Sequence, residues 1–124
     1  MIDHVSVSVS DLDRSAVFYD AVLGAIGYIK LETRAATIAF GRKYSEFWIN
    51  HRPWMKPVEE DSGTHIALRA ASQDMVDAFH AAALAQGGAS DGEPGLRPQH
   101  GEGYYAAFIR DPDGNRIEAV TFVK

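Results

Sequence analysis

Two stretches of the chain alternate apolar and polar positions, and each leads into a helical pattern. Valine alternates with serine over residues 5–9, which predicts a half-buried strand. Residues 11–27 then place apolar side chains at helical spacing, with aspartates at the start and glycines at the end. The same order returns as a predicted strand over 63–72 and a predicted helix over 73–88.

Short segments rich in β-branched and aromatic residues follow each helix and predict the remaining strands. After the first helix they lie at 28–33, 36–41 and 45–50. After the second helix come a Gly-rich loop at 87–103, a strand over 104–110, a DPDG turn and a strand over 115–123. A loop of this length is typical of a lid or binding loop, and its part near 95–98 is expected to supply the missing strand. The predicted order is strand, helix and three strands, twice.

The two units share residues as well as a pattern. Shifting the chain by 61 residues aligns six identical pairs: His4/His65, Asp13/Asp74, Phe18/Phe79, Ala21/Ala82, Leu23/Leu84 and Gly27/Gly88. Average residue usage gives roughly one or two such pairs by chance, so we infer an internal duplication. We expect one domain over 1–124, with a first module at about 1–50, a connector at 51–62 and a second module at about 63–124.

Strand parity predicts which face carries the polar side chains. The valines of the first strand should meet the helix, so His4 points the other way, and the internal symmetry places His65 likewise. On the last strand, Glu118 shares a face with Val120 and Phe122. A carboxylate inside a sheet is costly unless a cation meets it. Two imidazoles and one carboxylate are a common set for a divalent metal, which predicts a site of His4, His65 and Glu118.

Composition narrows the classes of function. Hydrophobic residues at 46% and charged residues at 23% are typical of a soluble globular protein. The absence of cysteine excludes disulfides and thiolate chemistry, and the net charge of −5 argues against a nucleic-acid surface. No apolar run approaches the roughly 18 residues of a membrane span. The first residues lack the features of a secretion signal, so a cytoplasmic protein is expected.

The stretches IDHVSVSVSDLDRSAVFYDAVLG, GTHIALRA and YYAAFIRDPDGNRIEAV resemble the vicinal oxygen chelate superfamily, also called the glyoxalase/bleomycin resistance protein/dioxygenase superfamily. The resemblance spans nearly the whole chain. It implies an α+β fold in which two tandem βαβββ modules form a curved mixed sheet around a cup. It also implies that His4, His65 and Glu118 match the metal-ligand positions.

One position departs from the lyase branch of this resemblance. Lactoylglutathione lyases have a fourth ligand on the last strand of the first module, and that place falls on Trp48. If the register slips by two, Glu46 or Asn50 takes the position. Indole does not bind a metal as a carboxylate does, so the three-ligand set is more similar to the dioxygenase and fosfomycin-resistance thiol-transferase branches.

Further side chains are candidates for contact with a substrate. Tyr104 and Tyr105 are predicted as catalytic hydrogen-bond donors to an oxyanion, and simple strand packing is the alternative. The residues predicted to bind substrate are Trp48, Asn50, Arg69 and Arg97. Arg97 would meet an anionic group from the long loop.

The resemblance implies an enzyme that uses a divalent ion (Fe, Mn, Zn or Ni) to bind an oxygen-bearing small molecule. Its reaction stays open among lyase or isomerase, dioxygenase and thiol transferase. The alternative is a non-catalytic drug- or metabolite-binding protein of the bleomycin-resistance type. A homodimer is implied, with the modules paired within one chain or exchanged between two. Exchange would bring His4 of one chain to His65 and Glu118 of the other.

Overall fold

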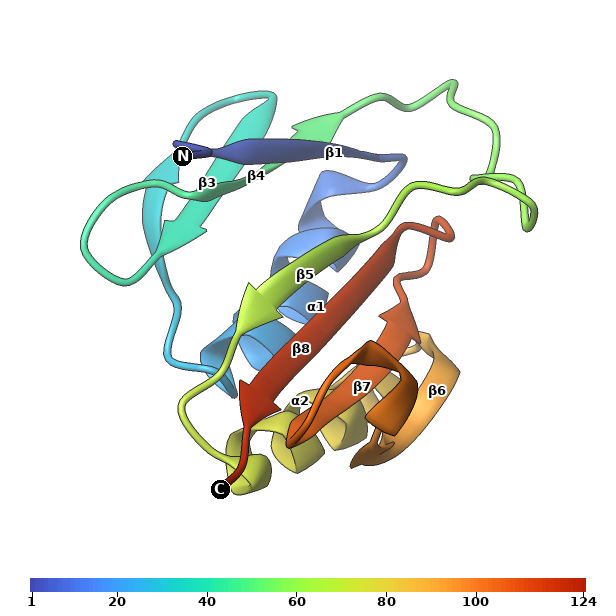
Figure 1. Cartoon of the computed structure of the whole chain (residues 1–124). Coiled ribbons are helices and arrows are strands. Elements are labelled where there is room, and N and C mark those ends of the chain that lie inside the picture. The colour runs from blue at the N-terminus through green and yellow to red at the C-terminus, as the bar shows by residue number, and fades with distance from the viewer.

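The computed structural model describes all residues, 1–124, and confirms two βαβββ modules (Figure 1). The first module consists of β1 (Val5–Val9), α1 (Leu12–Gly24), β2 (Ile29–Thr33), β3 (Thr37–Gly41) and β4 (Phe47–His51). The second consists of β5 (Ile66–Arg69), α2 (Gln73–Ala85), β6 (Ala89–Leu96), β7 (Tyr104–Arg110) and β8 (Arg116–Phe122). A single 3₁₀ turn, Pro98–His100, lies between β6 and β7.

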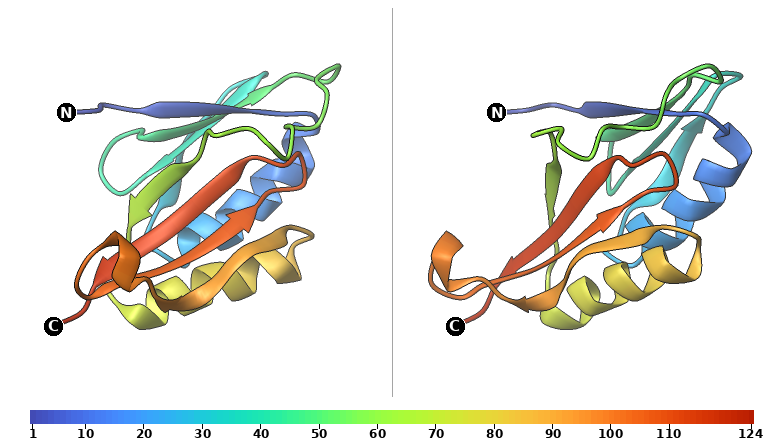
Figure 2. Two further views of the ribbon diagram at one scale, coloured as in Figure 1. Left: turned by 45° about the vertical axis from the view of Figure 1, so that its right-hand side comes forward. Right: turned by 90° about the vertical axis from the view of Figure 1, so that its right-hand side faces the viewer.

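Each module forms its own four-stranded sheet, in the orders β1-β4-β3-β2 and β5-β8-β7-β6. The first strand of a module pairs in parallel with the last, and the other pairs are antiparallel. The strands β1 and β5 are therefore edge strands, and Figure 1 shows them on neighbouring sides of the two sheets. The helices lie together behind the sheets, and Figure 2 shows the N-terminus projecting on the side away from them.

The two helices begin and end at positions that are 61 residues apart, as the repeat predicts. Asp11 caps α1 by accepting a hydrogen bond from the backbone N–H of Arg14, and Ser72 caps α2 in the same way. Each helix thus begins where a short polar side chain satisfies a free backbone donor. Neither helix is long and apolar enough to cross a membrane.

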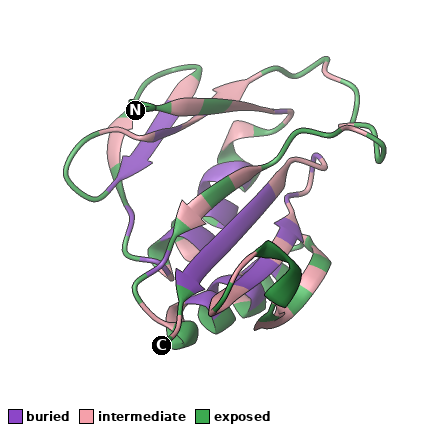
Figure 3. Ribbon diagram, in the orientation of Figure 1, coloured by how far each residue is buried: buried purple, intermediate pink, exposed green.

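One hydrophobic core joins the two modules. It contains 20 buried residues drawn from both helices and both sheets. The predicted apolar faces are confirmed, because Val9 of β1 and Ile117 and Ala119 of β8 belong to this core, and Val5 and Val7 pack against it. Figure 3 shows β8 buried along most of its length, whereas the edge strands β1 and β5 consist mainly of partly buried and exposed positions.

The predicted loop at 87–103 is shorter than expected. β6 occupies Ala89–Leu96, so the strand begins well before the segment at 95–98 that was expected to supply it. The register between β6 and β7 shifts on both sides of Gly92, whose φ of 159° is nearly extended. Only the connection at 97–103 remains outside the sheet, which leaves less chain for a lid.

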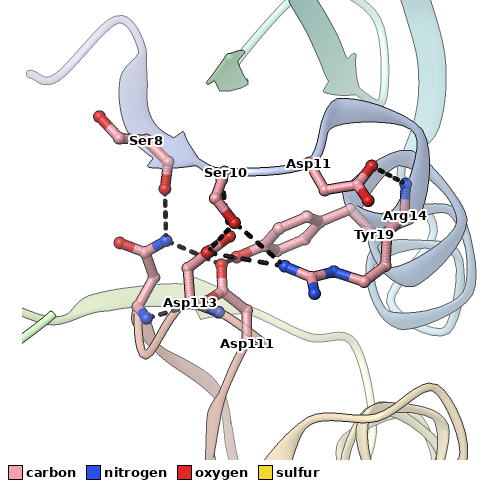
Figure 4. Close-up of polar contacts among 8 residues, drawn as sticks. Ser8, Ser10, Asp11, Arg14, Tyr19, Asp111 and Asp113 are labelled. Carbon is pink, nitrogen blue, oxygen red and sulfur yellow. Dashed lines mark hydrogen bonds and ion pairs between the residues drawn. The ribbon is translucent and has the colours of Figure 1, made fainter. Parts of the chain in front are cut away.

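Polar contacts around the DPDG turn tie the modules together, and we call Ser8, Ser10, Tyr19, Asp111, Asp113 and Asn115 the inter-module cluster (Figure 4). The Tyr19 hydroxyl of α1 donates to Asp111 over 2.6 Å. Ser10 donates from its backbone N–H and its hydroxyl to Asp113, over 3.0 and 2.5 Å. Asn115 donates to the Ser8 carbonyl over 2.8 Å.

The carboxylate of Asp111 is the centre of this cluster. It is 4% exposed and accepts four hydrogen bonds: from Tyr19, from the backbone N–H groups of Asp113 and Asn115, and from the Asn115 amide. Burial raises the pKa of Asp111, and the four donors act in the opposite direction by favouring the charged form. Burial also raises the pKa of Tyr19, with a further contribution from Asp111, so Tyr19 stays a donor.

Candidate functional site

The buried carboxylate of Glu118 lies at the centre of the outer face of the second sheet. It is 1% exposed, and His65 is its only ion-pair partner, with 3.0 Å between His65 Nε2 and Glu118 Oε1. The other carboxylate oxygen accepts a hydrogen bond from the Tyr104 hydroxyl. Burial and this bond raise the pKa of Tyr104 to about 12, so the hydroxyl is protonated at neutral pH and acts as a donor.

Rings surround this group, and sequence reasoning missed two of them, Phe108 and His100. Phe108 lies opposite Glu118 in the register of β7 and β8. Phe122 packs edge-on against Tyr104 with 5.4 Å between ring centroids, and the His100 ring lies 5.3 Å from the Tyr104 ring. Strand parity alone places both phenylalanines on the Glu118 face. Nothing in the sequence pattern indicates His100, because it reaches Tyr104 from the turn after β6.

The structure brings His65 and Glu118 together, whereas His4 makes no hydrogen bond to either of them. The imidazole of His4 pairs with the neighbouring Asp3 over 2.9 Å and is 56% exposed. Nowhere in the chain do three or more His, Cys, Asp or Glu side chains gather in a group able to hold a metal ion. The two histidines do line one pocket of about 380 Å³ between β1 and β5.

The pair of His65 and Glu118 fits two neighbouring ligands of one divalent ion. Metal–nitrogen and metal–oxygen bonds of about 2.1 Å that meet at a right angle separate the two ligand atoms by about 3 Å. Nε2 and Oε1 are 3.0 Å apart. Both oxygens of Glu118 have a partner, His65 on one and Tyr104 on the other, and no arginine or lysine lies beside them. A divalent ion would add positive charge to this buried carboxylate. Two of the three predicted ligands therefore lie at a spacing that one divalent ion could bridge, without forming a complete group of three.

The strand register decides which residue of the first module corresponds to Glu118. Ser6 lies 61 residues before Ala67, and Ser6 pairs with Trp48 as Ala67 pairs with Glu118. The first module thus presents Trp48 at the equivalent place, and the alternative at Glu46 does not follow the register. Trp48 and Glu118 are 70 residues apart rather than 61, because the second module has a longer β6–β7 region.

The outer face of the first sheet holds its polar side chains in contacts with one another. Trp48 lies under the guanidinium of Arg34, with 5.3 Å from Cζ to the ring centroid. The side-chain oxygen of Asn50 accepts a hydrogen bond from Thr37 over 2.6 Å. Both predicted substrate-binding residues are partly buried on this face, and neither is hydrogen-bonded to Glu118.

The predicted arginines lie over aromatic rings of the second sheet. The Arg69 guanidinium lies 4.7 Å from the Phe122 ring, and the Arg97 guanidinium lies 5.5 Å from the Phe108 ring. Arg97 also donates to the Glu93 carbonyl over 2.5 Å. Since both phenylalanines belong to the ring of side chains around the carboxylate, these cations stand at the border of the candidate site.

Tyr105 points to the opposite face of β7. Its hydroxyl donates to Asp77 of α2 over 2.6 Å, whereas the neighbouring Tyr104 donates to Glu118. The two tyrosines predicted as equivalent candidates therefore differ in face, because consecutive side chains of a strand alternate. Tyr105 is not part of the group around Glu118.

A second pocket, of about 310 Å³, opens on the connector side of His65. Arg116 shapes it by donating to the carbonyls of Ser62 and Glu60, and it also lies 3.3 Å from Asp91. These contacts fix the end of the connector beside the imidazole. The pocket is lined by Glu60, Asp61, Ser62, Gly63, Thr64, His65, Asp91, Phe108 and Arg116.

Comparison with known proteins agrees with this architecture. Residues 1–119 match the model of the Glyoxalase/Bleomycin resistance protein/Dioxygenase superfamily. The chain belongs to this superfamily. Small-molecule binding is typical of the superfamily, and its members are often metal-dependent. The two sheets that carry Glu118 and Trp48 on their outer faces thus belong to a glyoxalase-like fold.

Individual relatives support the fold over its whole length. A glyoxalase/bleomycin resistance protein from Albidiferax ferrireducens T118 is 37% identical, with a TM-score of 0.83, over 95% of this chain and 96% of that one. The fosfomycin resistance protein FosX from Mesorhizobium loti shares the fold at 18% identity and a TM-score of 0.70, over 99% and 92% of the two chains. A Brassica oleracea var. gemmifera protein named "Putative lactoylglutathione lyase" is 32% identical over 94% of this chain, which spans only 43% of that protein.

Proposed function

We propose that this protein is a divalent-metal-dependent enzyme that acts on an oxygen-bearing small molecule. The observation that carries the proposal is the buried Glu118 carboxylate, which has an imidazole at ligand spacing and no other cationic partner. A bound divalent ion supplies Lewis-acid polarisation of a substrate oxygen and stabilises the negative charge that develops there. In this proposal the protein ligands of the ion are His65, Glu118 and His4.

The chain's own residues have separate tasks around this ion. His65, directly before β5, and Glu118 of β8 bind it on the sheet face that Phe108 makes apolar. The pocket beside His65 admits a small molecule and is shaped by the connector that Arg116 holds. Trp48 stands where a lactoylglutathione lyase would have its fourth ligand, which favours the branches that use three protein ligands.

A second copy of the chain supplies His4. In one chain His4 is exposed and pairs with Asp3, and the N-terminus projects from the body on the side away from the helices (Figure 2). The open edges of β1 and β5 give a second copy strands to pair with. The proposed enzyme is therefore a homodimer in which each site takes its imidazoles from both chains.

Mixing two defective variants tests this arrangement. We expect H4A and H65A each to bind no metal alone, because each lacks one ligand in both sites of its dimer. Refolding an equal mixture should restore about one quarter of the wild-type metal content, because half of the dimers are mixed and each has one complete site. Elemental analysis after dialysis against Mn²⁺, Fe²⁺, Ni²⁺ or Zn²⁺ gives the content, and H51A is the control that should bind like wild type.

Each other outcome has a distinct meaning. A mixture that stays empty while the wild type binds metal would place His4 in the site of its own chain and remove the second-copy arrangement. A wild-type protein that takes up none of the four ions would overturn the metal-dependent enzyme. In that case binding of a small molecule by the metal-free protein would support the bleomycin-resistance type of binder.

A further inference from the structure

We infer that Tyr104 is a positioning residue that orients Glu118 for metal binding, an inference that rests on the proposed function. The Tyr104 hydroxyl donates to one carboxylate oxygen, and His65 lies beside the other. The two oxygens of Glu118 therefore have different partners: one accepts a hydrogen bond from the neutral Tyr104 hydroxyl, and the other faces the imidazole of His65. This arrangement presents Glu118 to the ion through a single oxygen.

The surroundings of Tyr104 fix its hydroxyl in this place. Its ring stands between Phe122, which packs edge-on at 5.4 Å, and His100, whose ring centroid is 5.3 Å away. The strand register also pairs Tyr104 with Phe122 across β7 and β8. A ring held from two sides has few rotamers, so the hydroxyl loses little conformational entropy when it binds the carboxylate.

The hydrogen bond between Tyr104 and Glu118 explains why a phenol is suitable at position 104. A ligand carboxylate that also accepts a hydrogen bond keeps its orientation. Hydrogen-bond partners of metal ligands commonly contribute 10- to 100-fold to metal affinity, which corresponds to about 1.4 to 2.8 kcal/mol. Tyr104 meets the carboxylate without adding a charge, so the negative charge of Glu118 stays available to the ion. An arginine in its place would compete with the metal for that charge.

The substitution Y104F tests the inference, because it removes the hydroxyl and keeps the ring. We expect metal affinity, measured by titration of the metal-free protein with Zn²⁺, to fall about 10- to 100-fold. The visible bands of the Co²⁺-loaded protein should change as well, since they report the geometry of the ligands. Y105F is the matched control: it removes a phenol-to-carboxylate bond of the next residue on the opposite face and should change neither readout.

A double-mutant cycle separates positioning from a general structural role. If Tyr104 acts through Glu118, then Y104F should have no further effect on metal affinity in an E118Q background. Wild-type affinity and an unchanged Co²⁺ spectrum in a folded Y104F variant would overturn the inference and leave the proposed function standing. A wild-type protein that binds no metal would overturn both.

Discussion

D111A is expected to lower the free energy of unfolding by about 3 to 5 kcal/mol, because it leaves several buried donors without an acceptor. The substitution removes the acceptor of four hydrogen bonds inside the inter-module cluster. The Tyr19 hydroxyl is then left without a partner at a site with no exposure, and two backbone N–H groups lose theirs. Thermal unfolding should move down by about 10 to 20 °C, measured by circular dichroism.

A matched control is available on the surface. Asp77 also accepts a tyrosine hydroxyl over 2.6 Å, from Tyr105, but it lies on the exposed side of α2. D77A should cost less than about 1 kcal/mol, because water replaces the lost acceptor. A cycle of D111A with Y19F should show positive coupling, since the bond joins α1 of one module to the turn of the other. Equal losses in D111A and D77A would mean that the cluster does not hold the modules together.

The faces of the strands were predictable because they follow from local alternation. Valine and serine alternate in β1, and Glu118 stands between core residues in β8, so parity alone separates the outer face from the core. The same rule puts Tyr104 and Tyr105 on opposite faces, and the pairing of Tyr104 with Phe122 across β7 and β8 decides that Tyr104 shares the face of Glu118. The sequence pattern predicts the strand at 104–110 but not this pairing between strands.

The distance between His4 and His65 was not predictable in this way. The internal repeat places both histidines on equivalent faces, but the packing of one module on the other determines how far apart they lie. That packing depends on contacts such as Ser10 with Asp113, which are 103 residues apart in the chain. No local pattern indicates such a pair. The strand β6 was underestimated for a different reason: its glycines and proline have low strand propensity, and pairing with β7 overrides it.

E118Q is expected to lower metal affinity by at least about 100-fold while the stability of the metal-free protein stays the same or rises. The amide keeps the size of the carboxylate and still accepts a hydrogen bond from Tyr104, and its NH₂ group can donate to a neutral His65. What it removes is a charge that is 1% exposed and has no arginine or lysine beside it. A buried charge of this kind lowers the stability of the folded protein, and such a loss is expected where the charge binds a ligand. Titration with Zn²⁺ and urea unfolding of the metal-free protein measure the two quantities.

The control for this prediction is E46Q, the same change at the carboxylate beside the pocket that contains both histidines. Because the register assigns the equivalent position to Trp48, E46Q should bind metal like the wild type. A metal-free E118Q that is clearly less stable than the wild type would show that Glu118 is a structural partner of His65 and Tyr104. An E118Q variant that is more stable but binds metal more weakly would instead show that the carboxylate lowers stability and is kept for binding a cation.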